Sequence, residues 1–425
     1  MGKIAFLFPG QGSQYTGMGK TFYDNYSIAR ETFEEANDVL KFNLKELCFE
    51  GNLEELTRTE NTQPAILTAS VAAFRVYMHE IGVMPDLMAG HSLGEFSALT
   101  CAEVIRFSDA LGIVRKRGLF MQGAVPVGVG AMSAVAGLEA GTVEEVCSSC
   151  TTQGELVVVS NYNSSEQLVI SGHKSAVLKA GEKLSALGAK VIPLKVSAPF
   201  HSPLMITAAD RLKEELEKYN YSDFICPVVS NVTALPYRGK EDVVEKLVSQ
   251  IVSPVQWIAS MEFIKSEGIT LAVEMGPKNV LKNLMKKNTP GIKAYSFDDK
   301  TDFEAFKEAI TIKPVPTAWV GEKAALFLSK CIATAVCTKN RNWNDDEYQK
   351  GVVEPYRRIQ KIYDELERSG KEPTIDQMRD ALEMLRSVFI TKKVPVEESM
   401  ERFNEIFDET GTRELFPDFI MGMGG

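Results

Sequence analysis

The hydrophobic positions near the start of the chain change their period several times before residue 100. Residues 3–8 (KIAFLF) are an almost continuous apolar run with the length of a buried strand. The glycine-rich segment 9–14 ends that strand, and helical patterns then extend to residue 81, interrupted at Asn61-Thr62-Gln63-Pro64. A second short run, Leu87-Met88-Ala89, precedes another glycine-containing turn and another helical pattern. Strands and helices in alternation predict an α/β fold with functional loops at strand ends.

From residue 128 the pattern changes to short strands separated by two amphipathic helices. The strands are expected at 128–135, 157–159, 168–172 and 191–194, and the helices at 138–150 and 174–187. The resulting β-α-β-β-α-β order is that of a ferredoxin-like unit. We therefore expect residues 128–197 to be a small subdomain inserted in a larger α/β-hydrolase-like domain, which comprises residues 1–127 and 198–312.

Beyond Pro314-Val315-Pro316, which we interpret as a linker, only helical periods are found. Apolar residues recur at one helical spacing at Ile359, Ile362, Tyr363 and Leu366. Thr374 and Gln377 have the spacing of a capping box, and Pro395 suits the first turn of a further helix. Residues 317–425 are therefore predicted to form an all-α C-terminal extension.

Composition and charge exclude several classes of protein. The chain has 425 residues, 44% of them hydrophobic and 24% charged, and its formal net charge is −10. An acidic chain without a basic and aromatic pattern is not expected to bind nucleic acid. No apolar run has membrane-spanning length and no signal-peptide pattern is found, so we expect a cytoplasmic protein without a membrane partner. The seven scattered cysteines are expected to stay reduced.

The pentapeptide Gly90-His91-Ser92-Leu93-Gly94 lies between the second apolar run and a helical pattern. A Gly-x-Ser-x-Gly sequence between a strand and a helix is typical of a nucleophile elbow, in which the glycines permit a turn tight enough to expose the serine hydroxyl. The alternative is an ordinary glycine and serine turn. As a nucleophile, Ser92 needs a base and an oxyanion hole.

The chain has only four histidines, so the candidates for a base are few. His91 adjoins the serine and is expected to point away from it, His79 falls in a helical pattern, and His173 ends a predicted strand. His201 lies between two prolines in the loop VSAPFHSPLM, where the larger domain resumes. With Ser92 it would catalyse acyl transfer by removing and returning the serine proton. The alternative is a solvated loop histidine.

Two backbone amides are candidates for the oxyanion hole. One belongs to Leu93, directly after the nucleophile, and the other to Gln11 in the Gly10-Gln11-Gly12 loop at a neighbouring strand end. No acidic third member of a triad can be assigned, and a backbone carbonyl or an amide can orient the imidazole instead.

Arg117 carries a charge on the apolar stripe of a predicted helix. Its neighbours three and four positions away are Ile113, Val114, Phe120 and Met121. A guanidinium on a core face needs an anionic partner, because an unpaired buried charge is costly. That partner is either a structural Asp or Glu, or a substrate carboxylate such as that of a malonyl group.

With these residues assembled, the chain resembles the malonyl-CoA:acyl carrier protein transacylases, the acyltransferases of fatty-acid and polyketide synthesis. Nine stretches match the family in order over residues 1–290: FLFPGQGSQ (6–14), TQPA (62–65), GHSLGEFSAL (90–99), RKRGLFMQ (115–122), GVGAMSAV (128–135), SNYNSSEQLVISG (160–172), VSAPFHSPLM (196–205), SPVQW (253–257) and VEMGPKNVL (273–281). The resemblance implies that Ser92 is the acylated nucleophile and His201 its base, that Gln11 and Leu93 form the oxyanion hole, and that Arg117 binds the malonyl carboxylate.

The resemblance also implies roles for residues that the pattern alone did not single out. Gln63 and His91 would line the site, and the backbone carbonyl of Gln250 would orient the histidine. Phe200, directly before His201, is typical of members that prefer malonyl to methylmalonyl groups, because its ring would fill the space of an α-methyl group. Malonyl-CoA and an acyl carrier protein are the implied substrates, in a cleft beside the small subdomain, and no metal or redox cofactor is expected.

Residues 317–425 depart from the resemblance, because stand-alone transacylases of this family end near residue 310. The extension suits discrete acyltransferases that serve polyketide synthase modules in trans, so it would dock a carrier protein or a synthase. The alternative is a helical cap that stabilises the catalytic domain. Lys278, Lys282 and Lys286, spaced by four, predict a basic strip that would attract an acidic carrier protein.

The sequence leaves three other functions open. The chain could transfer an unusual extender unit that is already bound to a carrier protein. It could be a hydrolase that clears stalled acyl chains, although a carboxylate clamp at Arg117 has no use for monoacyl groups. It could also be a non-enzymatic protein that works through its helical tail, against which the intact set of Ser92, His201 and Gln11 argues.

Overall fold

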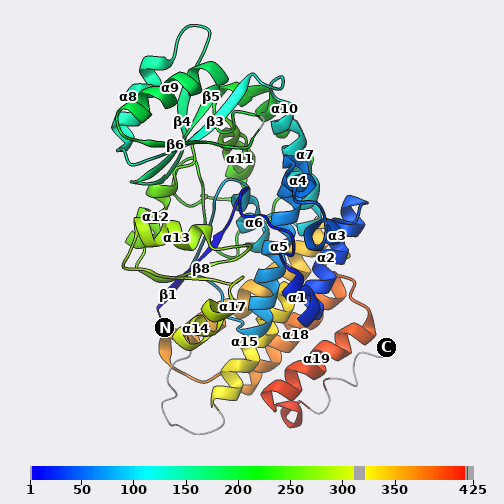
Figure 1. Cartoon of the computed structure of the whole chain (residues 1–425). Coiled ribbons are helices and arrows are strands. Elements are labelled where there is room, and N and C mark those ends of the chain that lie inside the picture. Colours follow the sequence, from blue (N-terminus) through cyan, green and yellow to red (C-terminus); the bar gives the residue numbers. More distant parts are fainter. Residues whose placement is uncertain (1, 197, 311–320, 417–418, 420–425) are drawn as a thin grey trace. The chain divides into compact units, whose positions relative to one another are not determined.

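A computed structural model of the chain describes residues 2–196, 198–310, 321–416 and 419 (Figure 1). Residue contacts divide the chain into two compact units. The first comprises Met1–Phe74 with Pro85–Ile310, and the second comprises Arg75–Met84 with Thr311–Gly425. The expected linker Pro314-Val315-Pro316 lies outside the described residues, as does Ser197.

The first unit contains a five-stranded parallel sheet with the strand order β7-β2-β1-β8-β9. Its strands are β1 (Lys3–Phe8), β2 (Leu87–Gly90), β7 (Val228–Val229), β8 (Ile269–Glu274) and β9 (Lys293–Ser296). Strand β1 is central because its residues from Ile4 to Phe8 are apolar and all are buried. Phe8 pairs with Gly90 at the ends of β1 and β2, so the loops that follow these strands leave the same edge of the sheet.

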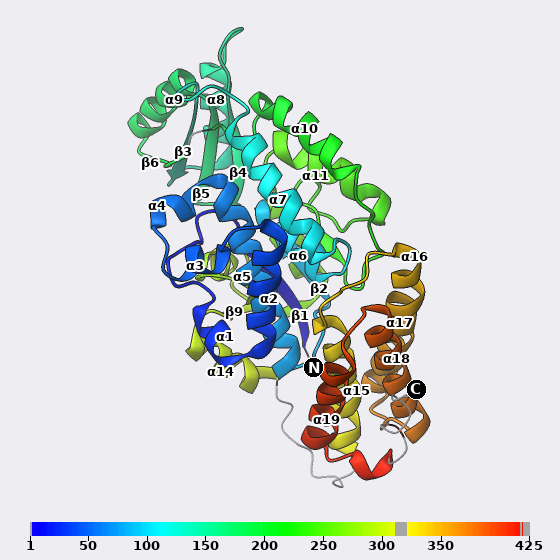
Figure 2. The same ribbon diagram turned by 90° about the vertical axis from the view of Figure 1, so that its right-hand side faces the viewer.

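Outside the inserted subdomain, the first unit contains the helices α1 (Lys20–Asn25), α2 (Ser27–Leu40), α3 (Leu44–Phe49), α4 (Leu53–Thr57), α5 (Thr59–Glu80), α6 (Leu93–Cys101), α7 (Phe107–Gln122), α10 (Ile206–Leu216), α11 (Val243–Val252), α12 (Trp257–Ser266), α13 (Val280–Asn288) and α14 (Lys300–Ile310). Of these, α6, α12, α13 and α14 contact the strands of the sheet. Every residue of α6 is buried, and α7, α10 and α11 pack side by side (Figure 2). Trp257 and Met261 of α12 and Met285 of α13 pack against Leu7 of β1 in one apolar core.

The predicted helix break at Asn61-Thr62-Gln63-Pro64 is wrong, because α5 runs through it. Pro64 has no N–H, so the carbonyl of Glu60 loses the amide that would normally bond to it four residues later. The guanidinium of Arg115 lies 3.5 Å from that carbonyl and donates to it. Pro64 is also only the sixth residue of the helix, so a single backbone hydrogen bond is lost and the helix continues.

Residues 130–193 form the predicted β-α-β-β-α-β unit. Its elements are β3 (Gly130–Ala136), α8 (Ala140–Cys150), β4 (Val157–Ser164), β5 (Gln167–His173), α9 (Lys174–Ala186) and β6 (Lys190–Pro193). The strands pair antiparallel in the order β4-β5-β3-β6, which confirms the ferredoxin-like prediction (Figure 1). A backbone bond from Tyr162 N–H to the Val255 carbonyl, 3.0 Å long, ties β4 to the chain before α12.

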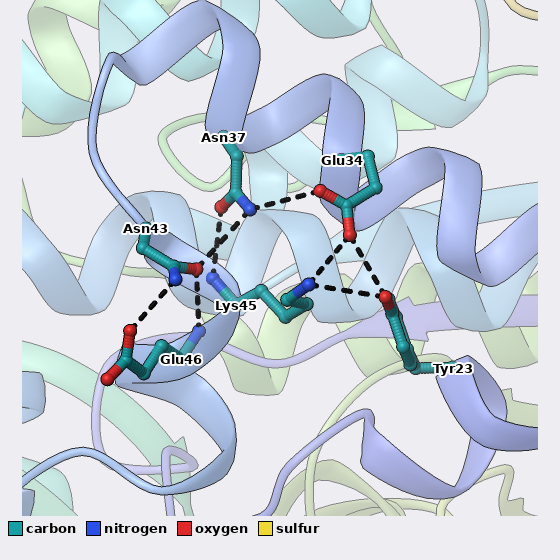
Figure 3. A network of polar contacts seen from close by, with 6 residues as sticks. All are labelled: Tyr23, Glu34, Asn37, Asn43, Lys45 and Glu46. Carbon is teal, nitrogen blue, oxygen red and sulfur yellow. Dashed lines mark hydrogen bonds and ion pairs between the residues drawn. The ribbon is translucent and has the colours of Figure 1, made fainter.

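A polar network joins α1, α2 and α3 at the surface (Figure 3). The ammonium of Lys45 lies 2.8 Å from Glu34 Oε1 and 3.3 Å from the Tyr23 hydroxyl, and this contact lowers the pKa of Glu34. Asn43 caps α3 by accepting the Glu46 N–H. Because these groups are largely solvated, the network orients three short helices and contributes little free energy.

The second unit is helical in its described part. Its elements are α15 (Gly321–Cys337), α16 (Asp345–Tyr348), the π-helical turn Gln349–Val353, α17 (Glu354–Ser369), α18 (Ile375–Thr391) and α19 (Val396–Thr410). The capping box of Thr374 and Gln377 is confirmed at the start of α18. Phe389 and Phe403 pack edge to face in its core. None of the helices that the structure describes is long and apolar enough to cross a membrane.

The last turns of α5 belong to this helical unit, which the sequence patterns did not indicate. Lys330 Nζ donates to the His79 carbonyl at 2.8 Å, and Cys337 Sγ lies 3.2 Å from the Arg75 carbonyl. The side chain of Tyr77 is fully buried, and burial, together with the nearby Tyr363 in α17, raises its pKa well above the ordinary value. Residues 75–84 are therefore a core element of the helical unit.

Candidate active site

Ser92 lies on a sharp turn between β2 and α6, with φ 52° and ψ −104°. A β-carbon added at Gly90 would lie 1.9 Å from the carbonyl oxygen of Gly94, and one added at Gly94 would lie 1.9 Å from the carbonyl oxygen of Phe8. Only glycine fits at these two positions. The turn holds Ser92 in a left-handed conformation that non-glycine residues rarely adopt, as a nucleophile elbow requires.

Ser92, His201 and Gln250 form a continuous chain of hydrogen bonds. The Ser92 hydroxyl lies 2.8 Å from His201 Nε2, and His201 Nδ1 lies 2.8 Å from the backbone carbonyl of Gln250. Because a carbonyl can only accept, Nδ1 carries the proton and Nε2 is left as the acceptor for the serine O–H. The structure therefore brings together the three residues expected for nucleophile, base and orienting carbonyl.

Burial determines the protonation state of His201. Desolvation, together with the nearby charge of Arg117, lowers the pKa of His201 to about 3. The imidazole is thus neutral at physiological pH and can accept the serine proton. His201 also has a left-handed φ of 57°, in the loop that the two prolines bracket.

Asn231 supports the elbow, and sequence reasoning missed it. Its Oδ1 accepts the Ser92 N–H at 2.6 Å, and its Nδ2 donates to the Gly90 carbonyl at 2.6 Å. The side chain thus bonds to the backbone on both sides of the turn. Asn231 follows β7, the neighbour of β2, so its position just beyond the end of a buried apolar run was the available signal.

The guanidinium of Arg117 is buried and lies beside the nucleophile. Nη1 donates to Gln63 Oε1 at 2.8 Å, and Nη2 donates to Gln250 Oε1 at 2.8 Å and to Ser92 Oγ at 3.1 Å. All three acceptors are neutral, and Nε has no partner among the described residues. Within the part of the chain that the structure describes, no Asp or Glu side chain bonds to this guanidinium, so it is available to a substrate anion.

A cavity of about 540 Å³ opens onto these groups. Ser92, His201 and Arg117 line it, as do Gln11 and Leu93, the two residues expected to provide the oxyanion hole. Leu93 is the first residue of α6, so its N–H has no partner within the helix. Other walls come from the ferredoxin-like subdomain and α13, so the cavity is a cleft between two parts of the first unit.

The other three predicted site residues differ in their surroundings. His91 lines the cavity and its Nε2 lies 2.8 Å from Asn163 Oδ1, while burial lowers its pKa. Phe200 lines the cavity directly before the base. Gln63 is fully buried and accepts a hydrogen bond from Arg117, but it is not among the cavity-lining residues, where the resemblance placed it.

The predicted strip of three lysines is wrong as a helical feature. Helix α13 begins at Val280, so Lys278 precedes it, with a left-handed φ of 65°. Lys278 Nζ instead donates to the Gly12 carbonyl at 3.2 Å, and Lys282 is paired with Asp302. Of the three, only Lys286 is an exposed cation on the helix.

The chain belongs to the family of acyl transferase domains, whose pattern matches residues 5–295. A malonyl CoA-acyl carrier protein transacylase from Bacillus subtilis is 38% identical over 400 residues, which are 94% of this chain and 99% of the relative. That alignment necessarily extends into the C-terminal helical region. The resemblance stated from the motifs, and the enzyme class that it implied, are confirmed.

Solved structures give the same result for the fold. A malonyl-transacylase in complex with its type II polyketide synthase acyl-carrier protein has a TM-score of 0.70 and 42% identity, covering 72% of this chain and 99% of that one. The malonyl CoA-acyl carrier protein transacylase of Coxiella burnetii has a TM-score of 0.71 and 38% identity, covering 73% of this chain and 98% of that one. The predicted fold class is therefore confirmed.

Proposed function

We propose that this enzyme transfers a malonyl group from malonyl-CoA to the phosphopantetheine thiol of an acyl carrier protein, by way of an ester on Ser92. One observation carries the proposal. A neutral histidine and a buried guanidinium both bond to the Ser92 hydroxyl, and no Asp or Glu among the described residues contacts that guanidinium directly. The names of the relatives support the same substrates.

Each half-reaction uses the same groups. Ser92 Oγ attacks the malonyl thioester carbonyl while His201 Nε2 takes the serine proton. The amides of Gln11 and Leu93 stabilise the tetrahedral oxyanion, and CoA leaves as a thiol after His201 returns the proton to its sulfur. The carrier-protein thiol then attacks the Ser92 ester, His201 takes the thiol proton, and that proton goes back to Ser92 Oγ.

Arg117 supplies the selectivity in this proposal. Its guanidinium would bind the free malonyl carboxylate through a pair of N–H groups, which requires that one or more of the present neutral acceptors be displaced. Phe200 would narrow the space beside the α-carbon and favour malonyl over methylmalonyl groups, a preference worth about 1–3 kcal/mol. The reaction requires no metal or redox cofactor, because side chains and backbone amides supply every group that it uses.

The acceptors would be carrier proteins of fatty-acid or polyketide synthesis, and we place the enzyme in the cytoplasm. All seven cysteines are buried thiols, in keeping with a reducing compartment.

For residues 317–425 we propose a stabilising cap. The inclusion of the end of α5 in the helical unit supports this role. Docking of a carrier protein or of a polyketide synthase module stays a prediction.

The transfer assay tests the proposal. The purified chain is mixed with malonyl-CoA and a holo acyl carrier protein, and the carrier is weighed by mass spectrometry. We expect malonylated carrier protein with the native chain and none with His201→Ala. Free malonate without malonylated carrier protein would show a hydrolase and overturn the proposal.

A further inference from the structure

Glu95 is a fully buried carboxylate three residues after the nucleophile. Tyr237 donates its hydroxyl to Oε1 at 2.5 Å. Gln250 Nε2 and the Asn231 N–H donate to Oε2 at 2.6 and 3.2 Å. All of these partners are neutral donors, so the ionised form of Glu95 is hydrogen-bonded but has no direct ion pair among them.

One amide separates this anion from the guanidinium of Arg117. Gln250 donates to Glu95 through Nε2 and accepts from Arg117 Nη2 through Oε1, at 2.6 and 2.8 Å. The second N–H of the same amide donates to the Ser92 carbonyl at 2.9 Å. A reversed amide would place N–H against Arg117 and oxygen against Glu95, so the orientation of Gln250 is fixed by all three neighbours.

The two buried charges also act on one another electrostatically. Burial raises the pKa of Glu95 to about 7, although its hydrogen bonds and the charge of Arg117 act against this rise, so the carboxylate is largely ionised only above pH 7. Burial lowers the pKa of Arg117 to about 9, and the charge of Glu95 acts against this fall. A direct ion pair would compensate the charges equally well, but it would occupy the N–H groups that a substrate carboxylate needs. Because the amide lies between the two charges, Arg117 donates only to neutral acceptors, which a substrate anion can displace.

We propose that Glu95 is a positioning residue that serves as the resident counter-ion of Arg117 through the side-chain amide of Gln250. Before substrate binds, it balances the buried guanidinium without blocking it. The malonyl carboxylate, whose binding here rests on the proposed function, then competes with Glu95 for the same positive charge.

Two measurements on Glu95→Gln test this role. The first is thermal unfolding of Glu95→Gln, Arg117→Met and the double variant. If the charges are coupled, Glu95→Gln lowers Tm in the native background and by less than half as much beside Arg117→Met. An equal loss in both backgrounds would mean that Glu95 only makes hydrogen bonds, and would overturn the proposal. This readout does not depend on the identity of the substrate.

The second measurement is the rate of Ser92 acylation by malonyl-CoA and by acetyl-CoA. Removing a competing anion is expected to lower the apparent KM for malonyl-CoA by roughly three- to tenfold and to leave that for acetyl-CoA unchanged. A raised or unchanged malonyl-CoA KM would overturn the counter-ion role. If neither thioester acylates the native chain, the proposed function fails while the Tm cycle still decides the inference.

Glu215→Gln is the matched control. Glu215 is also a buried carboxylate that accepts from a tyrosine hydroxyl, but it is paired directly with Lys116 and Lys218. Its substitution is expected to lower Tm equally with and without Arg117→Met and to leave both KM values unchanged. A control that behaved like Glu95→Gln would also overturn the proposal.

Discussion

Replacing Arg117 with alanine removes the group that would select the acyl chain. The native guanidinium is 1% exposed, so the malonyl carboxylate would meet it at the buried end of the cleft. Without Arg117 that carboxylate is buried without an ion partner, which costs about 3–5 kcal/mol. Malonyl loading is expected to fall by about 150- to 5,000-fold, since 1.36 kcal/mol corresponds to a factor of ten.

Acetyl loading separates the clamp from general damage. An acetyl group has no carboxylate, so its loading loses only what the Arg117 bonds to Ser92 Oγ, Gln63 and Gln250 contribute. We expect acetyl loading to fall by roughly tenfold, the effect of one hydrogen bond from a charged donor. The assay is single-turnover acylation of Ser92, followed by mass spectrometry with each thioester. Arg115→Ala is the control, because Arg115 lies two residues away on α7 and bonds to Asn61 outside the cavity. Equal losses of malonyl and acetyl loading in Arg117→Ala would refute the clamp.

Three further predictions concern the base, the elbow and the tail. Because burial holds the pKa of His201 near 3, the rate of single-turnover acetyl loading should stay constant from pH 8 to pH 5. With a histidine of ordinary pKa the rate would fall about thirtyfold over that range. A fall of that size would contradict the buried environment assigned to His201. Gly94→Ala should abolish Ser92 acylation or prevent folding, because its β-carbon would overlap the Phe8 carbonyl; native acylation by a folded variant, measured by mass spectrometry and circular dichroism, would contradict the elbow geometry. Deletion of 317–425 should lower Tm markedly, because it removes Lys330 and Cys337, which bond to the His79 and Arg75 carbonyls in α5. An unchanged Tm would contradict the role of the helical extension as a stabilising cap.

The parts of the fold that follow from local chemistry were predictable from sequence. The elbow depends on glycines whose absent side chains leave room for the turn, and a five-residue pattern contains that information. The order of strands and helices in the ferredoxin-like subdomain follows from hydrophobic period alone. His201 was identifiable because the chain offers few alternatives. Its pairing with Ser92 across 109 positions followed from the need of a nucleophile for a base.

What the sequence did not indicate depends on contacts between distant segments. Asn231 meets the elbow from a strand end 139 positions away, and Gln250 meets Glu95 from 155 positions away. Neither contact produces a hydrophobic period or a short motif in the sequence. Lys282 has the spacing of a basic strip but is paired with Asp302, which the spacing does not reveal. The break expected at Pro64 failed for the same reason, because a distant Arg115 takes the freed carbonyl.

The most direct test of the account is the mass of the intact chain after brief exposure to malonyl-CoA, methylmalonyl-CoA and acetyl-CoA. We expect one malonyl adduct, formed faster than either of the others, on the native chain and none on Ser92→Ala. A malonyl adduct that persists in Ser92→Ala would contradict Ser92 as the nucleophile. Equal loading by all three thioesters would contradict the selective site formed by Arg117 and Phe200.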